Sequence, residues 1–407
     1  MRILLLILLP FMSLARTIHV GPKQPVKTVQ QALTQAAAGD TVLIHPGVYR
    51  ERGLVVDKPL TILGQGYPVL DGQYKGEIFT VQSSDVTIQG LHLQNVGMVS
   101  TIDWAAVKVL EVQRVRVLSN RIRNAYFGVY LSASTNCLVQ GNDIAGNPKE
   151  EQNTGNGVHA WKCDNIKINN NQISGHRDGI YFEFVTNSTI QRNLSRQNIR
   201  YGLHFMFSHR NAYYYNTFRD NGAGVAVMYT KFVTMRHNVF EHNWGGAAYG
   251  MLLKDISDSE IEQNIFRTNT IGIHMEGTSR INIKRNQFTE NGWGVRIQAS
   301  CNDNTFTGNT FTSNTFDVAT NGNTVLNTFV RNYWDKYEGY DLNKDRIGDV
   351  PYHPVSLYSM IIEQMPYGVM LMRSFIVTLL DRAEKVIPSL TPEALVDSQP
   401  LMNPIKP

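Results

Sequence analysis

The chain has 407 residues, a net charge of +4 at pH 7, and 42% hydrophobic residues. The charge is small and spread along the chain without a stripe of Lys and Arg, so the composition argues against nucleic-acid binding. The length would suffice for about two or three ordinary domains. A solenoid, which grows by adding repeats, can contain this many residues in a single domain.

Residues 1–15 have the features of a secretory signal. Arg2 precedes an apolar run from Ile3 to Leu9, and a small-residue end, Ser13-Leu14-Ala15, follows it. This pattern predicts export with cleavage after Ala15. The run is too short for a membrane anchor unless it stays uncleaved, so we expect an exported mature protein.

Residues 16–58 are predicted to form an N-terminal cap. Residues 25–38 fit one amphipathic helix with Val29, Leu33 and Ala36 on one face, and Gly39-Asp40 ends it. Such a helix would cover the open end of a β-structure, whose first strands otherwise present unpaired backbone groups. A strand begins at Thr41, and further strands follow at residues 60–63, 79–81 and 86–88.

From Gly128 onward the sequence repeats. Most repeats begin with a Gly, have an Asn fourteen residues later, and a second Asn five residues after that. His176 replaces the second Asn in one repeat. A period of this size predicts a stacked array of units that cannot bury a core alone. The first set of asparagines is Asn142, Asn193, Asn216, Asn238, Asn264, Asn286 and Asn309, and the second is Asn147, Asn198, Asn221, Asn243, Asn269, Asn291 and Asn314.

Each repeat contains short strands and no helical period. The first and third residues after the Gly are apolar, as in Leu203 and Phe205, which is the alternation of a strand. A second strand follows, with inward-facing residues such as Val233 and Met235. Two residues past the turn Asn we expect a stacked aromatic column: Phe218, Phe240, Phe266, Phe288, Phe311 and Phe329.

Three short strands per repeat, without a leucine-rich-repeat pattern, predict an all-β fold. We expect a right-handed parallel β-helix over residues 59–334, with an N-terminal capping helix and a C-terminal helical tail. The asparagines should form hydrogen-bonded ladders at turns, where Asn tolerates left-handed backbone. Cys137 shares an inward column with Ile166 and Val233, which favours a buried thiol over a ligand or a disulfide.

One outward face of the predicted solenoid carries soft metal ligands. With coils stacked about 4.8 Å apart, His204, Met206 and Met228 cluster, and Glu183 lies beneath Met206. Thioether and imidazole groups suit Cu(I) rather than calcium or magnesium. These four residues are a candidate site for transient copper binding, and an ordinary protein-contact patch is the alternative.

Residues 335–359 form an Asp-rich capping segment. Asp341, Asn343, Asp345 and Asp349 are spaced like part of a calcium loop. The segment lacks the distal Glu of an EF-hand and has Arg346 where such loops prefer Gly. Calcium binding and a plain capping turn are both open at this point.

Residues 360–407 form a Met-rich apolar tail. Its apolar run from Val369 to Leu380 is too short to span a bilayer, so we predict a helix that docks on its own coils or on an apolar partner surface. The proline-rich residues 388–407 should be extended. The candidate partner-binding residues are Met360, Met365, Met370, Met372, Phe375 and Leu379.

Together these features resemble the NosD family. The resemblance rests on the signal sequence, the paired Asn turns, Asn332-Tyr333-Trp334, the segment Gly348-Asp349-Val350-Pro351-Tyr352, and the Met-rich tail. It implies a periplasmic, non-catalytic accessory protein that supports copper-site assembly in nitrous oxide reductase. The implied partners are an ABC transporter, with its membrane subunit NosY and ATPase NosF, and the copper chaperone NosL. The protein would be membrane-associated through the transporter, with its tail against the transporter's outer face.

The competing class is a polysaccharide lyase, epimerase or hydrolase. Glu183 and Glu276 should lie four coils apart, about 19 Å by the stacking distance. Glycoside hydrolysis needs two carboxyl groups at about 5–9.5 Å, so this pair does not qualify. Trp161, Tyr181 and Tyr130 keep carbohydrate binding as an alternative.

Overall fold

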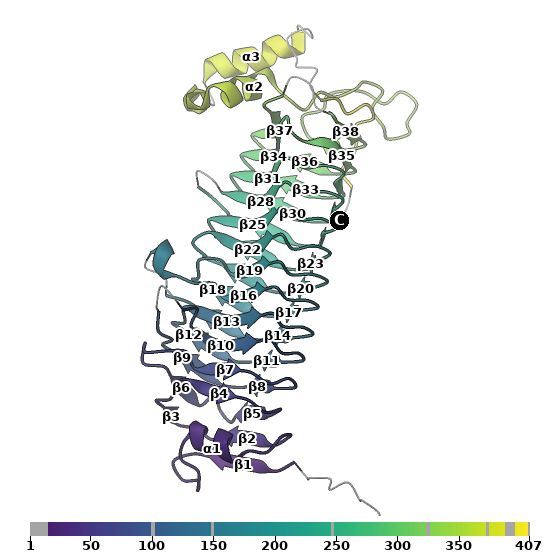
Figure 1. Ribbon diagram of the computed structural model, residues 1–407. Helices are drawn as coiled ribbons and strands as arrows, with labels where there is room; N and C mark the ends of the chain where they lie inside the picture. Colours follow the sequence, from purple (N-terminus) through teal and green to yellow (C-terminus); the bar gives the residue numbers. More distant parts are fainter. Residues whose placement is uncertain are drawn as a thin grey trace, which may run out of the picture.

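The computed structural model describes residues 15–98, 102–147, 150–245, 248–322, 326–371, 374–386 and 395–405. Within these residues three parallel sheets, which we name A, B and C, contain 14, 13 and 12 strands and run along a right-handed β-helix (Figure 1). Each complete coil contributes one strand to each of the three sheets. The predicted fold class is therefore confirmed.

Sheet A consists of β1 Thr17–Val20, β2 Thr41–Ile44, β5 Thr61–Gly64, β8 Thr87–Gln89, β11 Arg116–Leu118, β14 Leu138–Gln140, β17 Lys167–Asn169, β20 Thr189–Gln191, β23 Ala212–Tyr214, β26 Thr234–Arg236, β29 Glu260–Glu262, β32 Asn282–Lys284, β35 Asn302–Thr307 and β38 Leu326–Val330. Sheet B consists of β3 Val48–Tyr49, β6 Val69–Asp71, β9 His92–Gln94, β12 Arg121–Arg123, β15 Asp143–Ala145, β18 Gln172–Ser174, β21 Leu194–Arg196, β24 Thr217–Arg219, β27 Val239–Glu241, β30 Ile265–Arg267, β33 Gln287–Thr289, β36 Thr310–Thr312 and β39 Tyr333–Trp334.

Sheet C carries the candidate site and consists of β4 Leu54–Val56, β7 Phe79–Val81, β10 Ala105–Leu110, β13 Phe127–Ser132, β16 Val158–Trp161, β19 Ile180–Glu183, β22 Tyr201–Met206, β25 Ala223–Met228, β28 Tyr249–Lys254, β31 Ile271–Glu276, β34 Trp293–Ile297 and β37 Phe316–Thr320. A 3-10 turn, η1 Glu151–Asn153, lies in the connection between β15 and β16.

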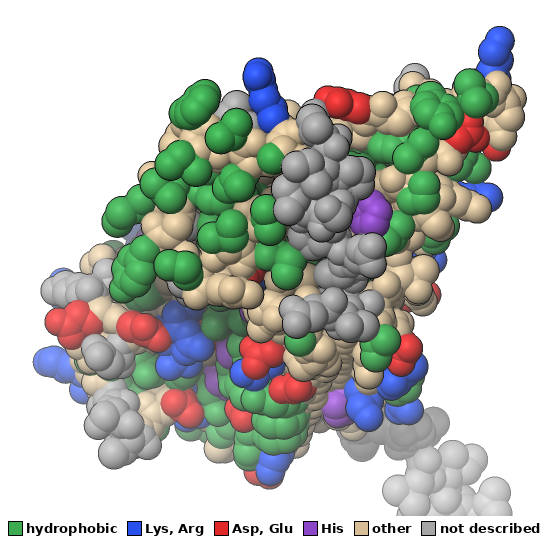
Figure 2. All heavy atoms as spheres, turned by 90° about the horizontal axis from the view of Figure 1, so that it is seen from above, with side chains coloured by type: hydrophobic (Ala, Val, Ile, Leu, Met, Phe, Trp, Pro, Cys, Tyr) green, Lys and Arg blue, Asp and Glu red, His purple; other side chains and the backbone are tan. Residues whose placement is uncertain are grey.

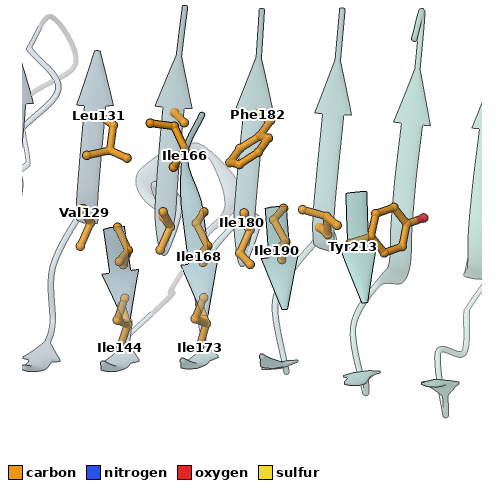
Figure 3. Packing of buried hydrophobic residues seen from close by; sticks show 14 of the residues in the cluster. Val129, Leu131, Ile144, Ile166, Ile168, Ile173, Ile180, Phe182, Ile190 and Tyr213 are labelled. Atoms are coloured by element: carbon orange, nitrogen blue, oxygen red, sulfur yellow. The ribbon is translucent and has the colours of Figure 1, made fainter. Parts of the chain in front are cut away.

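The core is the interior of the coil, filled by the alternate residues of all three sheets. Val129, Ile168 and Phe182 point inward from neighbouring coils and are fully buried (Figure 3). Burying a side chain of this kind contributes about 1.5–3 kcal/mol, and the column continues along the molecule. Glycine leads the sheet C strands because the coils approach closely there: a Cβ on Gly202 would lie 2.7 Å from the carbonyl oxygen of Gly224.

Two asparagine ladders line the turns, as predicted, although Asn147, the first expected member of the second ladder, is exposed. In the first ladder the backbone N and Nδ2 of Asn216 both donate to Oδ1 of Asn238, each at 3.0 Å. The expected left-handed backbone at the asparagines is wrong, because the residue before each Asn takes that conformation. Tyr215 and His237, for example, have φ of 56° and 55°. This leaves the Asn side chain free to pair between coils.

The prediction that Phe329 is the last member of the aromatic column is also wrong. Phe311 stacks on Trp334, with ring centroids 4.3 Å apart, whereas Phe329 stacks on Phe306 in sheet A. The reason is that Asn327 lies within β38 of sheet A and bonds to Asn304 of β35, so it is not a member of the turn ladder. The column from Phe218 to Phe311 is confirmed.

The N-terminal helix is shorter than predicted. Helix α1 spans Val29–Gln35, and the hydroxyl of Thr28 accepts a hydrogen bond from Gln31 N at its start. The inward face includes Val29 and Leu33, as expected. The first coil, β2 to β4, lies at residues 41–56, so the β-helix begins before the predicted boundary at residue 59.

The chain ends in a helical hairpin and a returning segment. Helix α2 Leu357–Gln364, η2 Pro366–Leu371 and α3 Phe375–Val386 replace the single helix expected over residues 369–380. Residues 395–405 run back along the last coil, where Asp397 forms a bridge with Phe329 and Leu401 with Tyr333. That part of the predicted partner-docking tail packs on the protein's own β-helix.

The predicted signal sequence, apart from Ala15, lies outside the described residues. None of the helices within the described ranges has both the length and the apolar character needed to cross a bilayer.

Candidate functional site

Three neighbouring strands of sheet C bring the predicted copper ligands together. Glu183 pairs with Met206 across β19 and β22, and Met206 pairs with Met228 across β22 and β25. All three side chains are partly exposed on the outer face. The predicted column of one carboxylate and two thioethers on successive coils is therefore present.

His204 is on the same face but is not exposed, contrary to the expectation. The residue is only 3% exposed. The centroid of its ring lies 5.0 Å from that of Tyr181 and 4.8 Å from that of Tyr201. The sequence pattern gave only the direction of the side chain. It did not show that aromatic rings from the same strand and from the preceding coil would cover the imidazole.

Asp178 orients the His204 ring. Its Oδ2 lies 3.3 Å from His204 Nδ1, and the carboxylate is completely buried. With Nδ1–H donating to Asp178, the lone pair of the neutral imidazole is at Nε2, which is buried and has no hydrogen-bond partner among the described residues. A histidine that binds a metal through one nitrogen commonly gives its other N–H to a carboxylate in this way.

Asp178 is the functional residue whose role the sequence analysis missed. It precedes Gly179 at the turn into β19, one coil before His204, so the spacing of the repeat would have placed the two side by side.

Tyr181 connects the imidazole to the thioether column. Its hydroxyl donates to Met206 Sδ at 3.6 Å, and its ring contacts His204 edge-on. Burial, together with the charge of Glu183, raises the pKa of Tyr181 to about 12. The phenol therefore stays protonated and keeps its hydrogen bond to the Met206 sulfur.

Two further histidines on this face are neutral at physiological pH. Burial and Arg177 lower the pKa of His159 to about 3, and burial and Arg296 lower that of His274 to about 4. His159 stacks between Tyr130 and Tyr181 with centroids 4.8 Å from each. Neutral imidazole is the form that binds metals, but these two rings lie on other coils and are not part of the Met206–Met228 column.

The donor set fits Cu(I). One oriented imidazole and two thioethers are soft or borderline ligands, which Cu(I) accepts and calcium or magnesium does not. Within the described ranges no three or more His, Cys, Asp or Glu side chains gather into a metal-binding group. His204, Met206 and Met228 are the residues that would hold copper, with Glu183 beside them.

Exposed aromatic residues flank this column. Phe184, Phe207 and Tyr229 directly follow Glu183, Met206 and Met228 and are 45%, 38% and 38% exposed. Their rings stack at 5.3 and 5.0 Å, so their faces are covered and their edges point to solvent. We call these three residues the aromatic ledge. Its signal in the sequence is an aromatic residue at the same position of three successive repeats.

The predicted calcium ligands are engaged with backbone amides. Asp341 Oδ2 accepts from Arg346 N at 2.8 Å, Asp345 Oδ1 from Ile347 N at 2.8 Å, and Asp349 Oδ2 from Leu342 N at 2.7 Å. Asn343 Oδ1 accepts from Asp345 N. These contacts describe a series of capping turns, and calcium binding stays an untested prediction.

The predicted partner-binding residues divide into two groups. Met360 is packed against the core, and Met372 lies outside the described residues. Met365, Met370, Phe375 and Leu379 are exposed, at 65%, 85%, 80% and 55%. Figure 2, viewed from the helical end, shows hydrophobic side chains gathered on that end of the molecule.

Glu183 and Glu276 are four coils apart, as expected, because Met206, Met228 and Lys254 separate them in the strand register. The pair therefore cannot serve as the two carboxyl groups of a glycosidase. Lys254 forms an ion pair with Glu276 at 3.0 Å, which occupies that carboxylate.

Comparison with known proteins decides the family. The family model described as "Periplasmic copper-binding protein (NosD)" matches residues 140–343, half of the chain. A protein of Pseudomonas aeruginosa named "Probable ABC transporter binding protein NosD" is 30% identical over 86% of this chain and 85% of its own length. The chain belongs to the NosD family. A NosD of Stutzerimonas stutzeri with the same printed name is 28% identical over 85% of this chain and 83% of its own.

Solved structures share the fold of this NosD-family chain. PfbA, a surface adhesin of Streptococcus pneumoniae, has a TM-score of 0.59 at 12% identity, covering 72% of this chain and 87% of its own. The catalytic unit of a GH87 α-1,3-glucanase from Streptomyces thermodiastaticus has a TM-score of 0.61 at 16% identity, covering 75% and 65%. At these identities the likeness concerns the β-helix and not the activity.

Proposed function

We propose that this protein is a periplasmic, non-catalytic copper-handling partner of an ABC transporter, and that it supports assembly of the copper sites of nitrous oxide reductase. The observation that carries the proposal is the oriented imidazole beside two thioethers on sheet C. Membership of the NosD family and the printed names of its relatives support copper and a transporter as its context.

The proposed copper site is suited to transient binding. His204 supplies Nε2 with Asp178 behind it, and Met206 and Met228 supply sulfur. Neutral sulfur and nitrogen donors bind Cu(I) without forming a closed thiolate site. An ion held in this way can be received from a chaperone such as NosL and passed on.

The aromatic ledge and the helical end are the proposed contact surfaces. The ledge borders the copper column, so a protein that exchanges copper there would cover its ring edges. The exposed side chains of η2 and α3 form an apolar surface at the end of the solenoid that would dock on the membrane subunit NosY, with NosF as the ATPase.

The test is the copper content of the reductase in cells. A strain lacking this gene would be complemented with the wild type, with the triple variant H204Q/M206L/M228L, or with M98L as a control on an exposed methionine. We expect the reductase purified from the triple variant to lose most of its copper, and that from M98L to be fully loaded. A fully loaded reductase with a stably expressed triple variant would contradict the proposal.

Docking is tested separately. M370S/F375S/L379S removes apolar side chains that are exposed, so the free energy of unfolding should change by less than about 1 kcal/mol. We expect this variant to bind Cu(I) normally but to co-purify poorly with NosY and NosF. Undiminished co-purification would mean that another surface contacts the transporter.

A further inference from the structure

Two histidines face each other at the N-terminal end of the β-helix, the end opposite to α2 and α3 (Figure 1). His19 lies in β1, and His45 directly follows β2. His19 is exposed and His45 is half-buried. His19 Nδ1 is 2.9 Å from His45 Nε2, and the ring centroids are 5.2 Å apart.

The backbone holds this pair in place. In the parallel pairing of β1 and β2, Val20 lies beside Ile44, and His45 N donates to Val20 O at 2.8 Å. His45 O in turn accepts from the hydroxyl of Tyr49 at 2.8 Å. Gly21 leaves room beside the pair, since a Cβ there would come within 3.1 Å of His45 Cβ. The backbone that carries the two rings is therefore held by the pairing of β1 with β2 and by the hydrogen bond from Tyr49 of β3.

The separation of the two nitrogens suits one metal ion. A first-row ion sits about 2.0–2.1 Å from each histidine nitrogen, which with nitrogens 2.9 Å apart gives an angle near 90° at the metal. Without a metal the same contact needs one ring to donate and the other to accept, so the two rings must adopt matching tautomers. A metal ion that displaces the shared proton would have one ligand nitrogen from each ring.

We propose that His19 Nδ1 and His45 Nε2 bind a divalent first-row ion, and Cu(II) in preference to the others. Imidazole suits Cu(II), Ni(II) and Zn(II), and divalent Cu has the highest affinity in that series. The pair stands alone within the described part of the chain, without a third His, Cys, Asp or Glu, so water completes the coordination. This site is distinct from the proposed Cu(I) column on sheet C in position, ligands and oxidation state.

Metal binding here would join β1 to the turn after β2. β1 is the edge strand of sheet A and pairs only with β2 within that sheet. A ligand that binds only the folded state stabilises it by RT ln(1 + [L]/Kd), where [L] is the concentration of free ligand. The bound ion would therefore strengthen the N-terminal end of the solenoid.

The test is a Cu(II) titration followed by electron paramagnetic resonance. The wild type is compared with H19Q, H45Q and H237Q, the last being a surface histidine that stacks on Tyr215. The N-terminus is acetylated or extended, because a free α-amine binds Cu(II) by itself. We expect a single Cu(II) with hyperfine splitting from two nitrogens, and a loss of affinity of about 10- to 100-fold or more in H19Q and H45Q.

The H237Q variant should bind as the wild type does, and so should H204Q/M206L/M228L. Circular dichroism shows whether H19Q and H45Q are folded, and Cu(II) should raise the melting temperature of the wild type but not that of H19Q or H45Q. Equal Cu(II) affinity in wild type, H19Q and H45Q would overturn the proposal, as would the absence of micromolar binding to the wild type. Neither result bears on the Cu(I) column, which is measured with other variants under reducing conditions.

Discussion

The buried ladder residue Asn238 uses the full hydrogen-bonding capacity of its side chain. Asn238 Nδ2 donates to Tyr213 O, Arg236 O and Asn264 Oδ1, each at 3.0 Å, and its Oδ1 accepts twice from Asn216. We expect Asn238→Ala to lower the free energy of unfolding by about 3 kcal/mol, because it strands buried partners on both sides. Urea denaturation checks this. Asn282→Ala, at an exposed strand position, should cost less than about 0.5 kcal/mol.

His176 replaces an Asn in the second ladder and makes the fold sensitive to acid. Complete burial lowers its pKa from 6.5 to about 4. Between these values the unfolded chain binds a proton that the folded chain does not. The contribution to stability is therefore complete above about pH 6.5 and is lost as the pH falls toward 4.

When the pH is lowered from 7 to 5, we expect the free energy of unfolding of His176→Asn to rise by about 2 kcal/mol relative to that of the wild type. His176→Gln separates titration from packing, since neither variant titrates there. Free energies of unfolding measured at pH 7 and pH 5 test this prediction. Parallel pH profiles for all three proteins would show that His176 is not the sensitive group.

The residue-scale predictions succeeded where the repeat alone decides the position. Strand alternation placed Met206 and Met228 on adjacent coils correctly. It failed for the exposure of His204, because that depends on Tyr201 and on Asp178 from the preceding turn. Contacts between a strand and the turn of another coil are not visible in a periodicity.

At the scale of elements, one ion pair anchors the helical hairpin. Arg296 of β34 contacts Glu363 of α2, with Nη2 and Oε2 2.6 Å apart, and the Glu363 side chain is 3% exposed. We expect Glu363→Gln to lower the local opening free energy of α2 by about 1–3 kcal/mol. Hydrogen exchange should rise in α2 and stay unchanged in sheet C. Glu111→Gln, at an exposed turn, is the matched control, and equal exchange in both variants would argue against the anchor.

Asp397 ends the first asparagine ladder. Its Oδ2 accepts from Asn332 N, Asn332 Nδ2 and Trp334 Nε1 at 3.0–3.1 Å, in the place of the next asparagine. We expect Asp397→Ala to release residues 395–405 and to destabilise the last coil by about 3 kcal/mol. Limited proteolysis detects the release. Gln399→Ala, on the exposed side of the same segment, should leave the cleavage pattern as it is.

Elements were predicted well inside the repeat and poorly at its ends. The apolar pattern of residues 25–38 suggested a longer helix, but capping by Thr28 starts α1 at Val29. The return of residues 395–405 depends on Asp397 reaching a ladder more than sixty residues earlier in the chain. No local pattern carries that information.

The whole molecule separates three surfaces along one rigid axis. The His19–His45 pair lies at the N-terminal end and the apolar helices lie at the other end (Figure 1). The candidate copper ligands His204, Met206 and Met228 and the aromatic ledge lie between them on sheet C. A solenoid keeps such surfaces at fixed distances, since each coil contacts only its neighbours. Under the proposed function, this arrangement would let a transporter and a copper-exchanging protein bind at the same time.

The most direct measurement is an anaerobic Cu(I) titration against a chromogenic chelator. We expect the wild type to bind a single Cu(I) with nitrogen and sulfur ligands in X-ray absorption, and H204Q/M206L/M228L to bind none. Asp178→Asn should weaken binding by about 10- to 100-fold, because it removes the group that orients His204. Unchanged Cu(I) affinity in the triple variant, or no binding by the wild type, would contradict the account of sheet C as a copper-handling face.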